Sequence, residues 1–149
     1  MSVTSICTYN VATIGPKQGV MEAAVRMREE HVGDLIVVEQ REGVTVPIGI
    51  LTDRDIVLGV VAKGVPVDAV TVSDAMTSPV LTVKESNGIA FTLREMRRMG
   101  VRRAPVVDDA GGLVAVVSVD DAIDHIAAQL ADIADAVRFG QHTETKARP

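Results

Sequence analysis

The chain has 149 residues, which is enough for one compact domain or two small fused ones. Hydrophobic residues make up 47% and aromatic residues only 2%, so the sequence predicts a globular protein with an aliphatic core. The formal net charge is −5. An acidic chain with so few aromatic side chains lacks the basic surface and the stacking platforms that nucleic-acid binding requires, which argues against a nucleic-acid partner.

The cellular location is suggested by three absences in the sequence. Cys7 is the only cysteine, so no intrachain disulfide can form, which fits a reducing compartment. Residues 1–10 have neither the basic segment nor the apolar run of a signal peptide. No apolar stretch is long enough to span a bilayer. We therefore expect a cytoplasmic protein without a membrane segment, and a poorly structured lead-in over residues 1–10.

The first half of the chain predicts strand, helix, hairpin and helix in that order. Apolar residues alternate with polar ones at helical spacing after Gly19, and Gly33 is expected to break that helix. A polar turn over 40–45 separates two apolar runs of strand length, and Gly64 ends the following helix. The predicted elements cover residues 11–14, 19–31, 35–38, 46–51 and 52–62.

The second half predicts the same order after a connector over 65–76, in which Ser73 is expected to cap one helical turn. Ser86 is expected to cap the next helix and Gly100 to end it, while Ser118 starts the last helix. The polar tail over 140–149 is expected to be disordered. The predicted strands and helices cover residues 80–83, 86–99, 104–107, 113–117 and 118–139.

This recurrence is an internal repeat. Residues 11–38 fall on 80–107 when shifted by 69 positions, with eight identical pairs, and the shift becomes 66 after the hairpin. Each β-α-β-β-α unit alone buries little core. The sequence therefore predicts an α+β fold in which two repeats pack sheet to sheet with pseudo-two-fold symmetry. We expect the repeats over 8–64 and 77–139, joined by the connector over 65–76.

Two strand-to-helix corners carry the candidate chemistry. Thr52 is followed three residues later by Asp55, and Ser118 is followed at the same spacing by Asp121. A carboxylate in the first turn of a helix can accept the two vicinal hydroxyls of a ribose, while the hydroxyl and the free N–H groups of the helix start can bind phosphate. The same spacing is also that of a capping box, in which both side chains serve only backbone donors.

The chain resembles a tandem pair of CBS domains, the cystathionine β-synthase-type regulatory repeat also called a Bateman module. The resemblance covers about residues 8–139 and rests on four blocks, namely 49–56, 76–79, 101–108 and 115–122. It implies a non-catalytic regulatory module that binds adenosine-containing ligands (AMP, ADP, ATP, S-adenosylmethionine or NAD) between the repeats. It also implies that Asp55 and Asp121 take the ribose, that Thr52 and Ser118 face the phosphate, and that no cofactor is required.

The two repeats differ where a phosphate is expected. Arg102 and Arg103 precede the middle strand of the second repeat and could neutralise phosphates, whereas the first repeat has Gly33 and Asp34 there. The arginines could equally be a solvated strand end. At the corners the charges are the other way round. The first repeat has the basic Arg54, and the second repeat has the acidic Asp120 at the equivalent position. We therefore do not expect equal ligand occupancy of the two sites.

An adenine would need an aliphatic slot, because aromatic residues are so scarce. Each candidate wall residue could equally be ordinary core. The candidates are Ile14, Val32, Ile50, Val80, Val101 and Val116.

Catalysis and metal binding have little support in the sequence. His31, His125 and His142 have no metal-site spacing, and no nucleophile stands near a base. We therefore expect neither an enzyme nor a metal protein. The alternative to a ligand sensor is a ligand-free dimerisation or interaction module, which the acids Asp34 and Asp120 favour. In either case an unidentified regulated protein could be a partner.

The last helix carries an apolar seam, in which large apolar residues recur at spacings of three and four. The seam is longer than such a unit needs to cover its own sheet, so we expect a homodimer. The alternative is that it folds back on its own sheet. The seam residues are Ile123, Ile126, Leu130, Ile133 and Val137.

Overall fold

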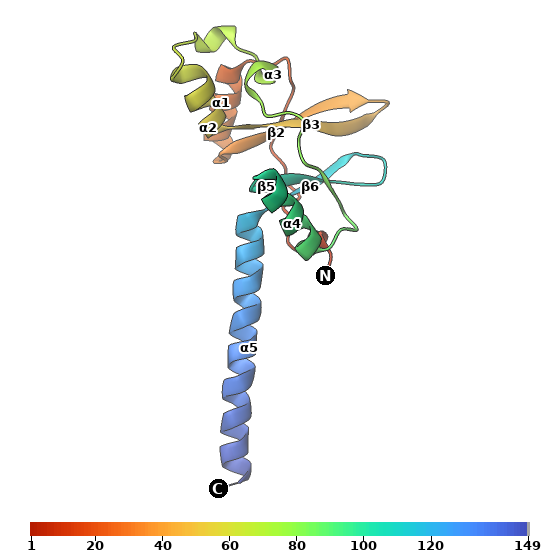
Figure 1. The fold of residues 1–149 in the computed structure, drawn as a ribbon, viewed down its shortest axis with the longest axis vertical. Coiled ribbons are helices and arrows are strands. Elements are labelled where there is room, and N and C mark those ends of the chain that lie inside the picture. The colour runs from red at the N-terminus through yellow and green to blue at the C-terminus, as the bar shows by residue number, and fades with distance from the viewer. Residues whose placement is uncertain (149) are drawn as a thin grey trace.

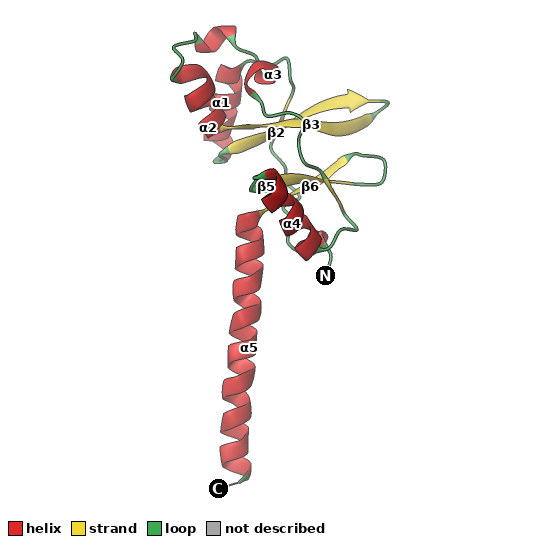
Figure 2. Cartoon of the chain, in the orientation of Figure 1, coloured by secondary structure: helices red, strands yellow, loops and turns green. Residues whose placement is uncertain are grey.

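A computed structural model describes residues 1–148, and Figures 1 and 2 show two small sheets with helices and one long outer helix. Each sheet has three strands, the first parallel to the middle one and the third antiparallel to it. The predicted α+β fold of two repeats is confirmed. The strands are β1 (Thr13–Ile14), β2 (Asp34–Arg41), β3 (Val44–Thr52), β4 (Val83–Lys84), β5 (Arg103–Val107) and β6 (Leu113–Ser118).

The helices also recur in the two halves. Helix α1 (Val20–Glu30) corresponds to α4 (Ile89–Met99), and α2 (Asp53–Ile56) with the π-helical turn η2 (Val57–Val61) corresponds to the start of α5 (Val119–Ala147). The remaining elements are the 3-10 turns η1 (Val3–Ser5) and η3 (Val67–Ala69), and the short helix α3 (Val72–Ala75).

Each repeat has its own aliphatic core beneath its sheet. In the first repeat Ile14, Leu35 and Leu51 are fully buried against α1, and in the second repeat Val106 and Val117 are buried with Met96 of α4. The two sheets face each other, and β3 contacts β6 (Figure 1). The space between the sheets is therefore where a ligand cleft can form.

The N-terminal segment is structured, contrary to the expectation for residues 1–10. Ser2 and Thr8 form bridges with Gly88 and Val116, and Val3 is fully buried in the core of the second repeat. The backbone N–H of Val3 donates to the carbonyl of Asn87 at 2.8 Å. Residues 1–10 are structured because an apolar side chain is buried against a distant part of the chain. No local pattern in residues 1–10 indicates this contact.

The connector makes the equivalent contacts with the first repeat. Thr71 and Thr77 form bridges with Gly19 and Ile50, and Val72 of α3 is fully buried in the core of the first repeat. These are the positions that a shift of 69 assigns to Ser2 and Thr8. Each repeat is therefore completed by the lead-in segment of the other, which interlocks the two halves.

Several predicted caps and ends are corrected by the structure. Helix α1 ends one residue before His31, which takes a left-handed conformation (φ 55°), so Gly33 is not the breaker. Thr71, not Ser73, caps α3, because its hydroxyl and Asp74 form a capping box. Gly88, not Ser86, caps α4, because Asn87 accepts the N–H of Lys84 and holds the preceding residues in a turn.

Strand β4 is also shorter and later than predicted. Only Val83 and Lys84 pair with β5, opposite Val106 and Val107, so Val80 lies before the strand. The predicted helix end at Gly100 is confirmed, since Gly100 takes the left-handed conformation (φ 67°). Ser118 starts the last helix, as predicted.

Helix α5 runs for 29 residues and projects away from both sheets (Figure 1). The helix continues through Ala147, so the expectation of a disordered tail over 140–149 is wrong for residues 140–147. Pro149 lies outside the described residues. The stretch 140–147 contains no proline, and hydroxyls of Thr143 and Thr145 bond carbonyls four residues back along the helix. No helix within residues 1–148 combines the length and the apolar character needed to cross a membrane.

Candidate functional site

Both corners are capping boxes. At the first, the N–H of Asp55 donates to Oγ1 of Thr52 (3.1 Å), and the N–H of Thr52 donates to Oδ2 of Asp55 (2.9 Å). At the second, the N–H of Asp121 donates to Oγ of Ser118 (3.0 Å), and the N–H and O–H of Ser118 donate to Oδ2 of Asp121 (2.9 and 2.6 Å). The capping interpretation is thus confirmed at both corners.

The caps leave acceptor capacity for a ligand. Within residues 1–148, Oδ1 of Asp121 takes part in no hydrogen bond, and its carboxylate is held in place by the two donors on Oδ2. An ionised carboxylate has about four lone-pair sites, so Asp121 can accept further hydroxyl donors without losing the cap. The cap and the ligand role are therefore compatible.

A cavity of about 200 Å³ opens between the repeats at the Ser118 corner. Four parts of the chain form it: residues 8–12, the start of β2 with Val32 before it, the facing strand ends of β5 and β6, and the first turn of α5. A larger hollow of about 650 Å³ lies along one side of the outer half of α5, where a single helix bounds it, so it is not an enclosed site. The residues lining the 200 Å³ cavity are Thr8, Asn10, Val11, Ala12, Val32, Asp34, Ile36, Arg103, Val116, Ser118, Asp120 and Asp121.

Six of the fourteen predicted site residues meet at this cavity. Val32 and Val116 supply aliphatic wall, and the polar members are Arg103, Ser118, Asp120 and Asp121. The remaining candidates lie elsewhere: Ile14 is a core residue of the first repeat (2% exposed), Val101 packs on the core of the second, and Arg102 lies outside the lining.

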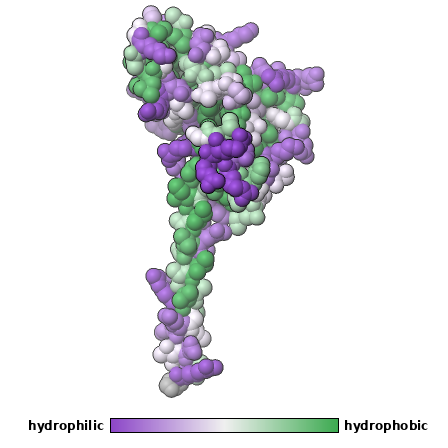
Figure 3. Space-filling model, viewed as in Figure 1, coloured by the Kyte–Doolittle hydropathy of each residue, from purple (hydrophilic) through white to green (hydrophobic). Residues whose placement is uncertain are grey.

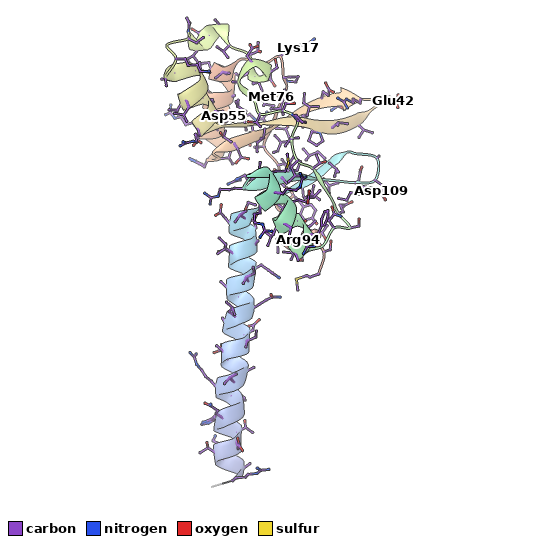
Figure 4. The ribbon with its side chains drawn as sticks, viewed as in Figure 1. Lys17, Glu42, Asp55, Met76, Arg94 and Asp109 are labelled. Carbon is purple, nitrogen blue, oxygen red and sulfur yellow. The ribbon has the colours of Figure 1, made fainter. Side chains whose placement is uncertain are left out.

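The other group of predicted residues sits at the opposite corner. Thr52 and Asp55 open α2, where Figure 4 labels Asp55, and Arg54 beside them is exposed. Ile50 of β3 is bridged to Thr77, and Met76, also labelled in Figure 4, crowds Gly49 so closely that a Cβ there would lie 2.5 Å from its sulfur. The structure therefore separates the two sets of candidates.

Sequence reasoning missed the lead-in part of the cavity and did not place Asp34 or Ile36 in its wall. A signal for Thr8 was present: extending the shift of 69 upstream aligns Thr8 with Thr77, which lies in one of the four blocks of the resemblance. The same extension aligns Asn10 with Pro79 of that block, and Val11 and Ala12 open the repeat that is already aligned. Ile36 carries no such signal, because its exposure to the cavity depends on how the sheets pack.

Arg103 is paired with Asp34 across the repeat interface. Nη1 of Arg103 lies 3.0 Å from Oδ1 of Asp34, and the two positions are equivalent under the shift of 69. The side chain of Asp34 is 9% exposed and that of Arg103 is 41% exposed. Burial raises the pKa of Asp34 above its ordinary value, with Arg103 opposing the rise and Asp53 adding to it. The cation predicted to bind phosphate is thus already engaged.

Arg102 is engaged as well. Its Nη2 lies 3.0 Å from Oδ1 of Asp120, and both side chains are largely exposed. The cavity wall therefore holds three carboxylates and one guanidinium. An added phosphate would have to compete with carboxylates for either arginine, so the local field does not favour a highly anionic ligand.

Cys7 lies beside the cavity residue Thr8 and is partly buried. Burial raises the pKa of its thiol to about 11, and the nearby carboxylates of Asp121 and Glu85 add to the rise. Its Sγ donates to the carbonyl of Val3 at 3.0 Å. It is therefore a thiol at neutral pH and a poor nucleophile. Across the described part of the chain, no group of three or more His, Cys, Asp or Glu side chains is placed to hold a metal ion.

Comparison with known proteins places the repeats in a family. A family model described as the CBS domain matches residues 3–62 and 72–128. An uncharacterized protein of Methanopyrus kandleri is 36% identical over 121 residues, which cover 81% of this chain and 60% of that protein. The chain thus spans about three fifths of the length of that relative.

Two solved structures share the fold. The CBS domain pair of protein MJ0100, in complex with 5-methylthioadenosine and S-adenosyl-L-methionine, is 25% identical with a TM-score of 0.73 and covers 85% of this chain and 99% of its own. A hexameric CBS-CP12 protein from bloom-forming cyanobacteria is 28% identical with a TM-score of 0.74 and covers 99% of this chain and 88% of its own.

Proposed function

The chain belongs to the CBS-domain family, and on that premise we propose that it is a non-catalytic sensor that binds an adenosine-containing ligand at the Ser118 corner. The observation that carries the proposal is the cavity of about 200 Å³, in which an anchored carboxylate faces aliphatic walls. That the related MJ0100 pair is in complex with 5-methylthioadenosine and S-adenosyl-L-methionine supports the ligand class.

Asp121 is the residue we assign to the ribose. Its carboxylate is oriented by the N–H and O–H of Ser118, so it is already fixed before the ligand arrives. Its Oδ1 can accept ribose hydroxyls, and charge-assisted hydrogen bonds of this kind are among the stronger polar contacts. Val32, Ile36 and Val116 supply the apolar wall for the adenine.

The charges favour an adenosine ligand with little negative charge. Asp34 and Asp120 already neutralise Arg103 and Arg102, and Asp121 adds a further negative charge. A triphosphate would need Arg103 to leave Asp34, which would strand a buried carboxylate. We therefore rank 5-methylthioadenosine, adenosine and the cationic S-adenosylmethionine above AMP, and AMP above ATP. The cavity is smaller than the usual 300–1,000 Å³ of ligand pockets, which suits a nucleoside better than NAD.

The test is calorimetry with the five ligands on the wild type and on two matched variants. Asp121→Ala should weaken binding of 5-methylthioadenosine by roughly 30- to 150-fold, because it removes about 2–3 kcal/mol of charge-assisted hydrogen bonding. Asp55→Ala is the control, since it deletes an equivalent capping box at the corner away from the cavity. It should cost similar stability while leaving the affinity at the Ser118 corner unchanged.

The outcomes separate the competing functions. No binding of any of the five ligands at millimolar concentration would sink the sensor proposal and favour the ligand-free interaction module. Tighter binding of ATP than of 5-methylthioadenosine would contradict the ranking by charge, and a selective loss of ATP in Arg103→Ala would then show that Arg103 moves from Asp34 to phosphate.

A further inference from the structure

The seam of α5 is an apolar feature that the fold leaves uncovered. Within residues 1–148 it packs on no other element beyond its first turns, and the alternative that it folds back on its own sheet does not occur. Figure 3 shows hydrophobic residues following the part of the helix nearest the sheets. The exposed fractions are 57% for Ile123, 44% for Ile126, 61% for Leu130, 61% for Ile133 and 57% for Val137.

The spacing of the seam fits packing against another helix. Ile123, Leu130 and Val137 share one heptad position, while Ile126 and Ile133 share the position three residues later. The flanking heptad positions, which carry the orienting Glu and Lys residues in parallel coiled coils, are held by alanine and glutamine here. The side chains flanking the seam are Ala127, Gln129, Ala134 and Ala136.

The charges along α5 are segregated by sign. Five aspartates and no lysine or arginine lie between 119 and 137, whereas 138–148 hold two arginines, one lysine and one glutamate. Two copies side by side in the same direction would place the acidic halves together. Two copies in opposite directions would bring Arg138 and the basic end of each helix toward the acidic start of the other, and would also oppose the helix dipoles favourably.

We propose that α5 pairs with α5 of a second copy in antiparallel orientation, with the two sheet bodies at opposite ends. The antiparallel register sets Leu130 of one copy opposite Ile133 of its partner and Ile126 opposite Val137, which alternates the two heptad positions across the contact. The same register brings Asp124 and Arg138 of the two copies to the same flank. The small alanines beside the seam permit the helices to approach closely.

Orientation is tested by disulfide trapping. In a Cys7→Ser background, Ile126→Cys and Val137→Cys proteins are oxidised separately and as a mixture. In the antiparallel pair, the two copies of residue 126 are about 16 Å apart along the axis, which is beyond the reach of a disulfide. The mixture should therefore cross-link, and the Ile126→Cys protein alone should not. Cross-linking of Ile126→Cys with itself would establish a parallel pair and overturn the proposal.

Association is tested by sedimentation of the full chain at tens of micromolar. The wild type should sediment at twice 15.8 kDa, and a mass of 15.8 kDa would overturn the proposal. Leu130→Asp should give the single-chain mass with an unchanged helical circular dichroism, because its side chain contacts no core. Ala128→Asp is the control, since it adds the same charge on the face opposite the seam, and it should leave the pair intact. Raising the salt concentration should weaken the wild-type pair several-fold.

Discussion

At the residue scale, the pairing of Asp34 with Arg103 bears on both stability and the proposed choice of ligand. The two residues occupy equivalent positions of the repeats, and they meet where the repeats face each other. The pair is asymmetric, because the carboxylate is nearly covered while the guanidinium keeps two fifths of its surface exposed. Removing one partner is therefore not equivalent to removing the other.

Arg103→Ala should lower the free energy of unfolding by about 2 kcal/mol at neutral pH, because it leaves a buried carboxylate without its cation. Asp34→Asn should cost less than about 1 kcal/mol, since the exposed guanidinium is solvated by water. The double variant should be no less stable than Arg103→Ala alone. Urea unfolding of the three variants measures the differences, and a larger loss in Asp34→Asn than in Arg103→Ala would contradict this account of the pair.

The pH dependence follows from the direction of the pKa. Burial already raises the pKa of Asp34 in the folded protein, and removing Arg103 raises it further. A raised carboxyl pKa means that the folded state loses stability as pH rises through that pKa and regains it as the group protonates. The cost of Arg103→Ala should therefore be complete at neutral pH and shrink in acid, which the same urea experiment shows when it is repeated between about pH 4 and 8.

At the element scale, the ends of α1 and α4 show how one fold position is filled in two ways. Both helices end in a left-handed residue, which is His31 in the first repeat and Gly100 in the second. The left-handed conformation brings Cβ close to the following carbonyl in any residue except glycine. The first repeat therefore carries a local strain that the second avoids.

His31→Gly should raise the free energy of unfolding by about 0.5–1 kcal/mol, after allowance for the greater chain entropy of glycine. Gly100→Ala makes the opposite change at the equivalent position and should lower the free energy of unfolding by about 1–2 kcal/mol. Thermal unfolding followed by circular dichroism checks both. If both substitutions changed the free energy of unfolding by the same amount in the same direction, the left-handed conformation would not be what sets the stability of these helix ends.

Local signals account for the elements that could be predicted. The helix start at Ser118, the end at Gly100 and the two hairpins each follow from residues within a few positions of them. The helix end at His31 could not be predicted in the same way, because a histidine rarely takes a positive φ. Thr71 and Gly88 were missed because a nearby serine offered a capping hydroxyl at each site.

Half of the residues that line the cavity could likewise be predicted from the corner motifs and the repeat. The pairing of Arg103 with Asp34 could not, because the shift of 69 relates the two positions but only the packing of the two sheets brings them together. The same holds for the order of residues 1–10, whose buried Val3 makes its contacts more than 80 positions away.

At the scale of the whole molecule, the exchange of lead-in segments joins the two repeats into one unit. Val3 completes the core of the second repeat and Val72 completes the core of the first. Neither repeat then keeps its full core when the other unfolds. The cavity at the Ser118 corner is lined by residues of both repeats and by residues of the segment 8–12, so the proposed ligand site depends on the same exchange of segments.

Val3→Ala should therefore lower the free energy of unfolding of both repeats together, by about 2 kcal/mol for a fully buried apolar side chain shortened in a packed core. Val72→Ala should have a similar effect for the same reason, although it lies in the other core. Val57→Ala is the control, because Val57 is 54% exposed and its truncation should cost little.

Native-state hydrogen exchange distinguishes a joint effect from a local one. Amides of Val37 in β2 and Val106 in β5 report on separate sheets, and in the interlocked molecule both should lose protection by the same factor in Val3→Ala. Urea unfolding should remain a single transition in all three variants, since a unit whose cores share segments opens as a whole. Loss of protection at Val106 alone, or two resolved transitions, would mean that the repeats unfold independently and that the exchanged segments only dock on them.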